Sequence, residues 1–354
     1  MNVSLGYGWR PRQGGSVGKK SEHTTRRMIV SRVTAMTSFY TTPPLRVARL
    51  LFELRPAARL HLPVEIRGNV LRGAFGTVFK RAVCQPGCPG AATCPNRDSC
   101  PYAMLFEPQW GVQSPENKDR DAPRGFLFRP TQDPDHDFGP DQPLHFELRL
   151  FGHAIEMAPF FINAFHSFAR QGLHGTPVHL SSIQTLDWTD SPRGELVSEG
   201  RVTRITPLIL RLGDLRPPRP PEGTVRIDYL TPTWLHHDHK DQRIPTLEAL
   251  VCRLRDRLSD LSQLYEGREW QADYGAMGRL AAEAEIVRCH GEWHKGQRRS
   301  SRTGQVMPLA GFLGTIVYEK VHPALIRLLV IGQEIHVGRY TVWGNGAYRL
   351  IHDG

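Results

Sequence analysis

The chain is poor in long apolar stretches and in cysteine. None of its apolar runs approaches the ~20 residues that a helix needs to cross a bilayer, so no membrane partner is predicted. The N-terminus lacks the apolar core of a secretory signal peptide. Four of the six cysteines lie close together, a distribution that disfavours a secreted fold held by disulfides. We therefore expect a cytoplasmic protein.

Acidic residues are also in deficit. Lys and Arg number 45 against 35 Asp and Glu, which gives a formal net charge of +10 and a pI of about 9.6. Such a charge favours an anionic partner, and nucleic acid is the commonest one. Charge alone does not choose between RNA, DNA and a membrane surface.

Residues 1–44 contain a single acid, Glu22, among Gly, Ser, Thr and scattered basic residues. This composition predicts a disordered basic leader. Met28 and Met36 are alternative starts within it. Because the segment is Arg-rich and poor in acids, a transit peptide is a less favoured alternative.

Apolar patterning divides the rest into two halves, 45–215 and 222–354, on either side of a Pro-rich hinge at 216–221. In the first half we expect strands at 45–54, 144–150 and 178–188 and helices at 70–82 and 159–172. In the second we expect strands at 225–230, 283–288 and 306–318, helices at 246–267 and 323–332, and a Gly-interrupted hairpin at 335–351. The predicted fold is α+β, with two tandem ferredoxin-like (RRM-like) domains and a Cys-rich insertion, 84–101, in the first.

The insertion contains Cys84, Cys88, Cys94 and Cys100, separated by three, five and five residues. Four thiolates can hold a tetrahedral Zn²⁺ that folds a loop with too little core of its own. These spacings differ from the usual Cys-x2-Cys pairs, so reduced free cysteines are the alternative. A metal held by all four thiols would be structural, since no open position would remain for catalysis.

The C-terminal stretch is rich in glycine. Gly338, Gly344 and Gly346 could let the backbone approach a ligand closely, and Arg339 adds charge beside them. Backbone N–H groups of such a loop can hold phosphates. A Gly-kinked hairpin without a ligand is the alternative, and no helix follows that would favour a dinucleotide site.

Two further stretches could contact phosphates. One is the loop predicted at 290–302, where Trp293 could also stack a base. The other is the entrance of the first predicted helix. A solvated basic surface is the alternative for both. The candidate phosphate ligands are Lys295, Arg298, Arg299, Arg302, Arg67 and Arg72.

The glycine-rich stretch resembles the C-terminal loop of the CRISPR pre-crRNA processing endoribonucleases, which belong to the repeat-associated mysterious protein (RAMP) superfamily. The shared pattern is His336-Val-Gly338, an aromatic and Thr stretch, then Gly344-x-Gly346-x-Tyr348. Further similarities in the same order are Leu71–Gly76, Cys100–Pro108, Tyr229–Thr233, Arg298–Arg302 and Pro308–Tyr318, so the resemblance spans roughly residues 45 to 351.

This resemblance implies a metal-independent RNase without a catalytic cofactor. A ribose 2′-OH would attack the neighbouring phosphate of CRISPR repeat RNA and leave a 2′,3′-cyclic phosphate and a 5′-OH. A base, an acid and cations are needed for this reaction. The partners would be the repeat RNA or its crRNA product and other subunits of a CRISPR effector complex.

The family often places a catalytic His near the first helix, and this chain has none directly after that helix. His61 and His294 are the candidate general bases. The cluster around His236 is interpreted as a solvated loop. The missing His keeps open a non-catalytic RAMP-type RNA-binding subunit. A zinc-organised DNA-binding regulator is the third alternative, although no recognition-helix pattern favours it.

Overall fold

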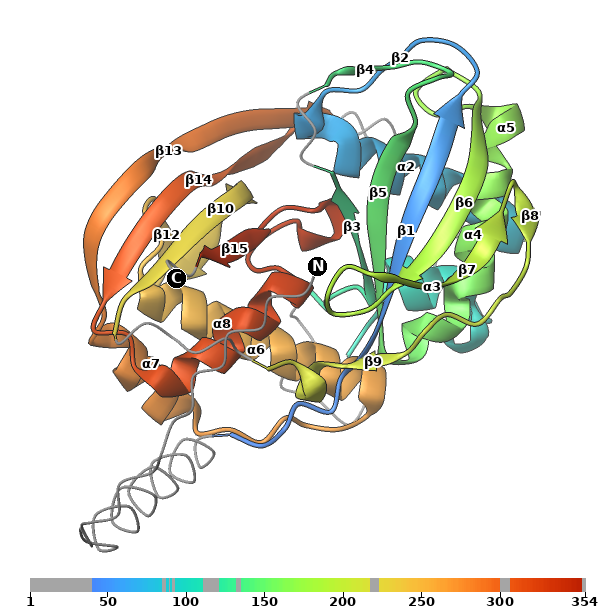
Figure 1. Ribbon diagram of the computed structural model, residues 1–354. Coiled ribbons are helices and arrows are strands. Elements are labelled where there is room, and N and C mark those ends of the chain that lie inside the picture. Colours follow the sequence, from blue (N-terminus) through green and yellow to red (C-terminus); the bar gives the residue numbers. More distant parts are fainter. Residues whose placement is uncertain are drawn as a thin grey trace, which may run out of the picture. The chain divides into compact units, whose positions relative to one another are not determined.

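The computed structural model describes residues 40–84, 87–88, 90, 93–110, 121–131, 135–216, 223–299 and 306–351 (Figure 1). Residues 1–39 of the predicted leader, residues 217–221 of the predicted hinge, and Arg302 lie outside the described residues. The last residues of the predicted leader, 40–44, are described, and the Trp270 indole donates a hydrogen bond to the Thr41 carbonyl. Among the described helices, none has the length and apolar character that a bilayer crossing requires.

The N-terminal half forms an antiparallel sheet in the order β3-β5-β1-β6-β7-β8, and β9 pairs with β1. Its elements are β1 (Arg46–Pro56), β2 (Leu60–His61), α2 (Val64–Val83), α3 (Pro101–Phe106), β3 (Phe126–Pro130), β4 (Asp137–Phe138), β5 (Leu144–Phe151), α4 (Ala158–His166), α5 (Phe168–Gln171), β6 (Val178–Leu186), β7 (Pro192–Ser198), β8 (Arg201–Val202) and β9 (Leu210–Arg211). The strands at 45–54, 144–150 and 178–188 are therefore confirmed. The sequence patterns missed the short strand β3.

The C-terminal half forms a second antiparallel sheet in the order β13-β14-β10-β15. Its elements are β10 (Val225–Thr233), β11 (Leu235–His237), β12 (Lys240–Gln242), α6 (Leu247–Glu266), α7 (Tyr274–Ala282), β13 (Glu285–Arg299), β14 (Val306–Glu319), α8 (Pro323–Ile335) and β15 (Tyr348–Ile351). The predicted ends of α6 are confirmed, because the Thr246 hydroxyl accepts the Ala249 N–H and Gly267 ends the helix.

Two predictions for this half are wrong. The basic stretch 290–302 is not a loop as far as Arg299, because β13 continues through it in register with β14. The stretch 335–351 is not a hairpin. It is a loop with a single 3₁₀ turn at Thr341–Trp343, and the strand that follows, β15, pairs with β10. Strand β15 finds its partner far along the chain, and β13 keeps its strand form through pairing with the next strand, neither of which local patterning reports.

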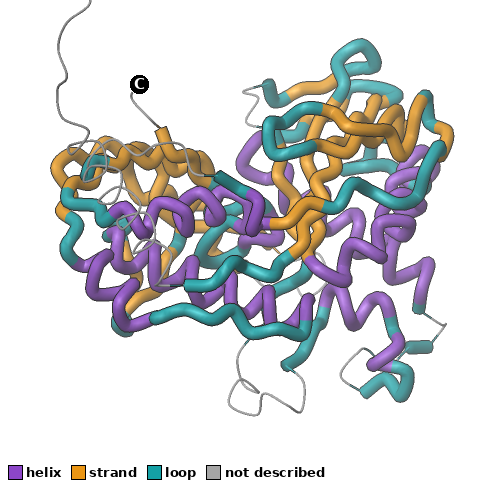
Figure 2. Tube along the Cα trace, turned by 60° about the horizontal axis from the view of Figure 1, so that its bottom comes forward, coloured by secondary structure: helices purple, strands orange, loops and turns teal. Residues whose placement is uncertain are grey.

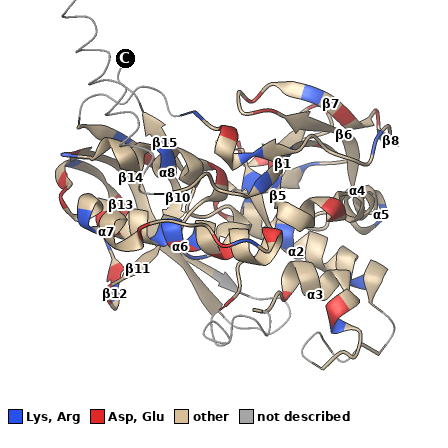
Figure 3. Cartoon of the chain, turned by 90° about the horizontal axis from the view of Figure 1, so that it is seen from below, with Lys and Arg blue, Asp and Glu red and all other residues tan. Residues whose placement is uncertain are grey.

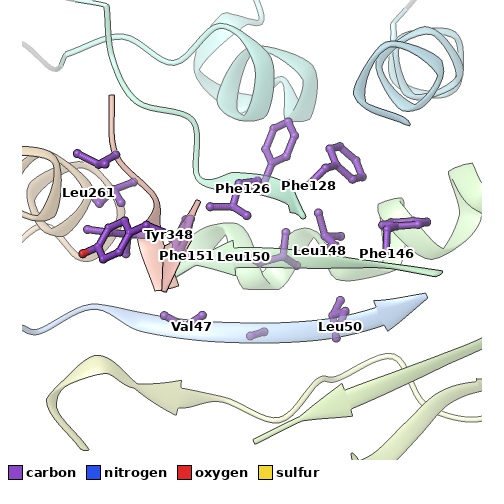
Figure 4. Close-up of a cluster of buried hydrophobic side chains, with 14 of the residues drawn as sticks. Val47, Leu50, Phe126, Phe128, Phe146, Leu148, Leu150, Phe151, Leu261 and Tyr348 are labelled. Carbon is purple, nitrogen blue, oxygen red and sulfur yellow. The ribbon is translucent and has the colours of Figure 1, made fainter. Parts of the chain in front are cut away.

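The α+β class is confirmed, with two antiparallel sheets and helices packed on them (Figure 2). In the first sheet β1 lies between β5 and β6, and β3 lies at one edge. In the second sheet β10 lies between β14 and β15, and β13 lies at one edge. One hydrophobic cluster extends from Phe128 and Phe146 in the N-terminal half to Leu261 and Tyr348 in the C-terminal half (Figure 4). The two sheets therefore share a core.

Charged residues also join the halves. On β5 the alternation predicts an exposed face for Glu147 and Arg149, but both are buried. Arg149 donates hydrogen bonds to the backbone carbonyls of Gln333 and Glu334 at the end of α8, and its guanidinium is 2.8 Å from the Glu147 carboxylate. The C-terminal half covers this face of the sheet, so burial of the charges depends on residues almost 200 positions away.

Candidate functional site

A cleft of about 600 Å³ lies where α2, α6, β11 and the glycine-rich loop come together. We define the glycine-rich loop as residues 336–347, between α8 and β15. The cleft is lined by Arg72, Asp121, Pro123, Arg124, Trp234, His236, Arg253, Asp256, Arg257, Asp260, Met307 and Gly338–Trp343.

The backbone of the first part of the loop is held against Trp234, the residue directly before β11. The Arg339 N–H donates to the Trp234 carbonyl at 3.1 Å, and the Arg339 guanidinium lies 4.3 Å from the centre of the Trp234 ring. Gly338 has a φ of +84°, and a side chain at this position would collide with the Trp234 carbonyl. Glycine thus brings the loop close to β11 and leaves the exposed Arg339 at the cleft.

The second part of the loop is buried. A Cβ on Gly344 would lie 2.7 Å from the Phe128 carbonyl oxygen of β3, and one on Gly346 would collide with the Val337 carbonyl. The prediction that Gly344 and Gly346 contact RNA is therefore corrected, because these glycines instead allow close packing of the backbone. Only the first part of the loop, with Gly338 and Arg339, lines the cleft, and its RNA contacts stay a prediction.

An aromatic pair lies between these two parts. The rings of Tyr340 and Trp343 stack with centroids 4.6 Å apart and planes 6° from parallel. Both residues line the cleft, Tyr340 half-buried and Trp343 buried. A flat aromatic surface beside cations is the arrangement on which an unpaired base stacks.

The two arginines predicted at the entrance of the first helix have different surroundings. Arg67 is fully buried and donates to the carbonyls of Leu62, Thr131 and Asp135, so a phosphate outside the fold cannot reach it. The prediction that Arg67 binds phosphate is corrected for this reason. Arg72, one and a half turns further along α2, lines the cleft and packs over the Phe106 ring at 4.9 Å.

Helix α6 contributes both basic and acidic residues to the lining of the cleft, and Figure 3 shows residues of both signs along this helix. Arg253 pairs with Asp256 at 2.9 Å, and Arg257 donates to the Ile335 carbonyl at 2.8 Å. Burial lowers the pKa of Arg257 to about 10, which still leaves it charged at neutral pH. The ion pair with Asp256 partly neutralises Arg253, so this helix presents charges of both signs to the cleft.

The predicted catalytic histidines lie outside the cleft lining. His61 is exposed on β2 and contacts Asp137 at 3.0 Å. Arg59 and His61 together lower the pKa of Asp137 to about 2. His294 is half-buried on β13, opposite Gly311 of β14. Neighbouring Lys295 is exposed, and the side chains of Arg298 and Arg299 lie outside the described residues.

The histidine of the glycine-rich motif is buried. His336 has no exposed surface, and its Nδ1 lies 3.2 Å from the Asn345 carbonyl. Burial, together with the nearby Arg149, holds the pKa of His336 well below its ordinary value. A neutral, enclosed imidazole positions the loop and cannot exchange protons with a substrate in the cleft.

Sequence reasoning missed His236 and Asp241. His236 lines the cleft on β11, and its Nδ1 lies 2.9 Å from Oδ1 of Asp241 on β12. The stretch Trp234-Leu235-His236 alternates like a strand, with Leu235 fully buried. That alternation was the available sequence signal, and it was obscured by the run of polar residues after it.

The four cysteines of the insertion line one cavity of about 350 Å³. The Cys88 thiol is within hydrogen-bonding reach of Cys84 and Cys94, and burial raises the pKa of Cys84 to about 11. Their chemistry suits zinc. However, no group of three or more His, Cys, Asp or Glu side chains in the described part of the chain is arranged to hold a metal ion.

Two family models match the chain. Residues 45–207 match a model described as an N-terminal domain, and residues 227–348 match the CRISPR-associated endoribonuclease Cas6. A protein of Archaeoglobus fulgidus, described as uncharacterized, is 28% identical over 312 residues, which are 86% of this chain and 96% of the relative.

Solved structures show the same fold. Cas6 (TTHB231) of Thermus thermophilus in a product complex is 15% identical, has a TM-score of 0.50, and the match covers 86% of this chain and 99% of that one. A chain of a partial Cas6-RT-Cas1–Cas2 complex is 13% identical with a TM-score of 0.52, over 89% of this chain and 47% of that one. At these identities the likeness establishes a Cas6-like fold.

Proposed function

Because the chain belongs, through residues 227–348, to the family of the CRISPR-associated endoribonuclease Cas6, we propose that it cuts CRISPR repeat RNA in the cleft beside the glycine-rich loop. The resemblance noted in the sequence is confirmed by this membership. The observation that supports the location is that Arg72 of α2 and the loop residues Gly338–Trp343 line one cleft although they lie far apart in the sequence.

The proposed reaction is metal-independent. The 2′-oxygen of the ribose before the cut attacks phosphorus, the bond to the 5′-oxygen breaks, and the products carry a 2′,3′-cyclic phosphate and a 5′-OH. A base accepts the 2′-OH proton and a donor protonates the leaving oxygen. DNA, which lacks the 2′-OH, would bind without being cut.

Arg72 and Arg339 are the cations we assign to the phosphate at the cut, because both line the cleft. Lys295 remains a proposed contact to the RNA backbone, since it is exposed on the long strand β13. The same proposal extends to Arg298 and Arg299, whose strand continues from Lys295. Stacking of an unpaired base on Tyr340 would orient the strand at the cut.

His61 and His294 are the proton-transfer groups proposed from the sequence, although neither lines the cleft. His61 has a carboxylate partner in Asp137, and His294 lies on the strand that carries the basic residues. If either is the general base, its replacement by Ala slows cleavage by ~10²–10⁴. A loss below about tenfold for both variants removes both assignments.

The test of the proposed function is an incubation of the full chain with repeat RNA in EDTA. A matched RNA carries a 2′-deoxy substitution at the cut, and duplex DNA serves as a third ligand. Cleavage of the unmodified RNA alone, with a 2′,3′-cyclic phosphate end, supports the endoribonuclease. Binding without cleavage supports the non-catalytic RAMP-type subunit, and a preference for duplex DNA supports the regulator.

We also propose the domain architecture and the zinc site that the sequence predicts. We interpret the two sheets as ferredoxin-like domains, 45–215 and 222–354, on the strength of their shared strand order. We also keep the structural Zn²⁺ at Cys84, Cys88, Cys94 and Cys100 as a proposal that rests on the thiols lining one cavity. Metal analysis of the purified protein tests it, and a zinc content unchanged by Cys94→Ser removes it.

The proposed partners follow from the substrate. A processed crRNA that stays bound would bring the protein to other subunits of a CRISPR effector complex. Because its substrate is a transcript, we place the protein in the cytoplasm. Co-purification of such subunits with this protein, in the presence and absence of the RNA, tests whether they bind to it.

A further inference from the structure

Of the histidines in the described residues, His236 is the one that lines the cleft. It lies on β11, two residues after Trp234, whose carbonyl holds the Arg339 N–H. Successive side chains of a strand alternate between its faces, so the buried Leu235 leaves Trp234 and His236 on the face of the cleft. The backbone contact that positions the glycine-rich loop therefore also positions His236 beside it.

Asp241 fixes the orientation of this imidazole. The residues lie directly opposite each other in the β11–β12 pair, and Nδ1 of His236 is 2.9 Å from Oδ1 of Asp241. The pKa of Asp241 is lowered by the nearby Trp234 indole, by His236 and by the charge of Arg339, so Asp241 is a carboxylate at neutral pH. A carboxylate that accepts the Nδ1 proton selects the tautomer with a free lone pair on Nε2.

The cations of the cleft complete the arrangement. Arg339 lies on the loop that contacts Trp234, and Arg72 enters from α2. Both can bind the non-bridging oxygens of a phosphate in the cleft, which places a ribose next to that phosphate within the same space as His236. His61 and His294 do not line this space, and His336 is buried.

We propose that His236 is a catalytic residue that accepts the 2′-OH proton at Nε2, with Asp241 as the positioning residue. This inference rests on the proposed function. The O–H bond breaks as the 2′-oxygen bonds to phosphorus, the P–O5′ bond breaks, and the leaving oxygen takes a proton from water. The proton on Nε2 then passes to the resulting hydroxide, so the enzyme returns to its starting state.

The first experiment measures single-turnover cleavage of repeat RNA by His236→Ala and His236→Gln at saturating protein. The expected loss is ~10²–10⁴ in the cleavage rate, the range for a general base. The Kd for RNA with a 2′-deoxy cut site should stay within about twofold, since a single uncharged contact is lost. His239→Asn is the matched control, because His239 is exposed at the turn of the same hairpin with a φ of +59°, which Asn tolerates.

Three further readouts separate proton transfer from folding. Imidazole added to His236→Gly should restore part of the cleavage rate, since the free base can occupy the vacated space. Asp241→Asn should slow cleavage by about tenfold or more without weakening binding, and Asp241→Glu should recover part of that loss. A 5′-phosphorothiolate RNA, whose leaving thiolate needs no proton, should leave the His236→Ala defect unchanged.

The outcomes distinguish this inference from the function on which it rests. If the unaltered protein cuts RNA and His236→Ala cuts it within tenfold of the same rate, the protein is an endoribonuclease but His236 is not its general base. If the phosphorothiolate restores His236→Ala, the residue donates the leaving-group proton, and the assignment as base is overturned. If the unaltered protein cuts no repeat RNA, the proposed function and this inference fail together.

Discussion

At its start, the glycine-rich loop exposes Arg339 to the cleft, whereas towards its end Gly344 and Gly346 are buried against neighbouring backbone. Both parts contain glycine and residues with a positive φ. The difference shows that glycine serves two purposes in one motif. In the first part it lets the backbone approach β11 so that a side chain reaches the cleft, and in the second it removes side chains that would separate packed elements.

The largest expected effect is on the buried part of the loop. Gly346 has a φ of +72°, and a methyl group there would collide with the Val337 carbonyl. We expect Gly346→Ala to reduce the free energy of unfolding by about 3 kcal/mol or more, measured by chemical denaturation. Gly73→Ala is the control, since nothing lies within 4 Å of a Cβ on this helical glycine. A Gly346→Ala protein as stable as this control would contradict the assigned packing role.

The next effect separates the two arginines of α2. Arg67→Met leaves three backbone carbonyls without their donor, so the free energy of unfolding should fall by about 2–4 kcal/mol. Arg72→Met should change stability by less than about 1 kcal/mol and weaken RNA binding instead. Denaturation and RNA titration of both proteins check this pair. Equal losses of RNA affinity in the folded proteins would show that burial does not separate their roles.

A smaller effect is expected from the exposed part of the loop. Arg339→Ala should weaken RNA binding by about tenfold and reduce the slope of log K against log[salt] by about one, because one phosphate contact is lost. Arg170→Ala on α5 is the matched control, an exposed Arg that does not line the cleft. An unchanged salt slope for Arg339→Ala would place the RNA phosphates elsewhere.

The smallest effect is a pH dependence of stability. Burial lowers the pKa of His336, so below its ordinary value near 6.5 the unfolded chain binds a proton that the native protein does not. Stability should therefore be complete above pH 6.5 and fall with acid, by at most about 1.4 kcal/mol per pH unit. Denaturation at several pH values should show a flatter slope for His336→Gln. His166, whose pKa burial also lowers, contributes to the slope that remains.

Local sequence patterns predicted the helices and strands whose apolar spacing and end signals lie within their own sequence. Helix α6 has a long apolar stripe, a Thr246 cap and a stop at Gly267, and all three are found. The first part of β13 was predicted as the strand 283–288, but its continuation through basic residues was missed because it depends on pairing with β14, which compensates for their low strand preference. The burial of Arg149 likewise depends on carbonyls contributed by α8.

The sequence located some of the residues that line the cleft and missed others for the same reason. Arg72, Gly338 and Arg339 were identified from composition and resemblance, and they do line the cleft. His236 was passed over because a polar run normally indicates solvent, and only the packing of the loop on Trp234 brings this residue to the cleft. Arg67 was misassigned because charge does not reveal whether an arginine finds its partners inside the fold.

The measurement that tests the central claim most directly is photocrosslinking of repeat RNA with 4-thiouridine at the nucleotide before the cut. A 2′-deoxy sugar at that position keeps the RNA intact, and mass spectrometry identifies the crosslinked peptide. A substrate held in the cleft should crosslink to Trp234 or to the Arg339–Trp343 segment, and Arg72→Met should reduce the yield. Crosslinks confined to the outer strands β7 and β8, with no product at the loop, would contradict the account.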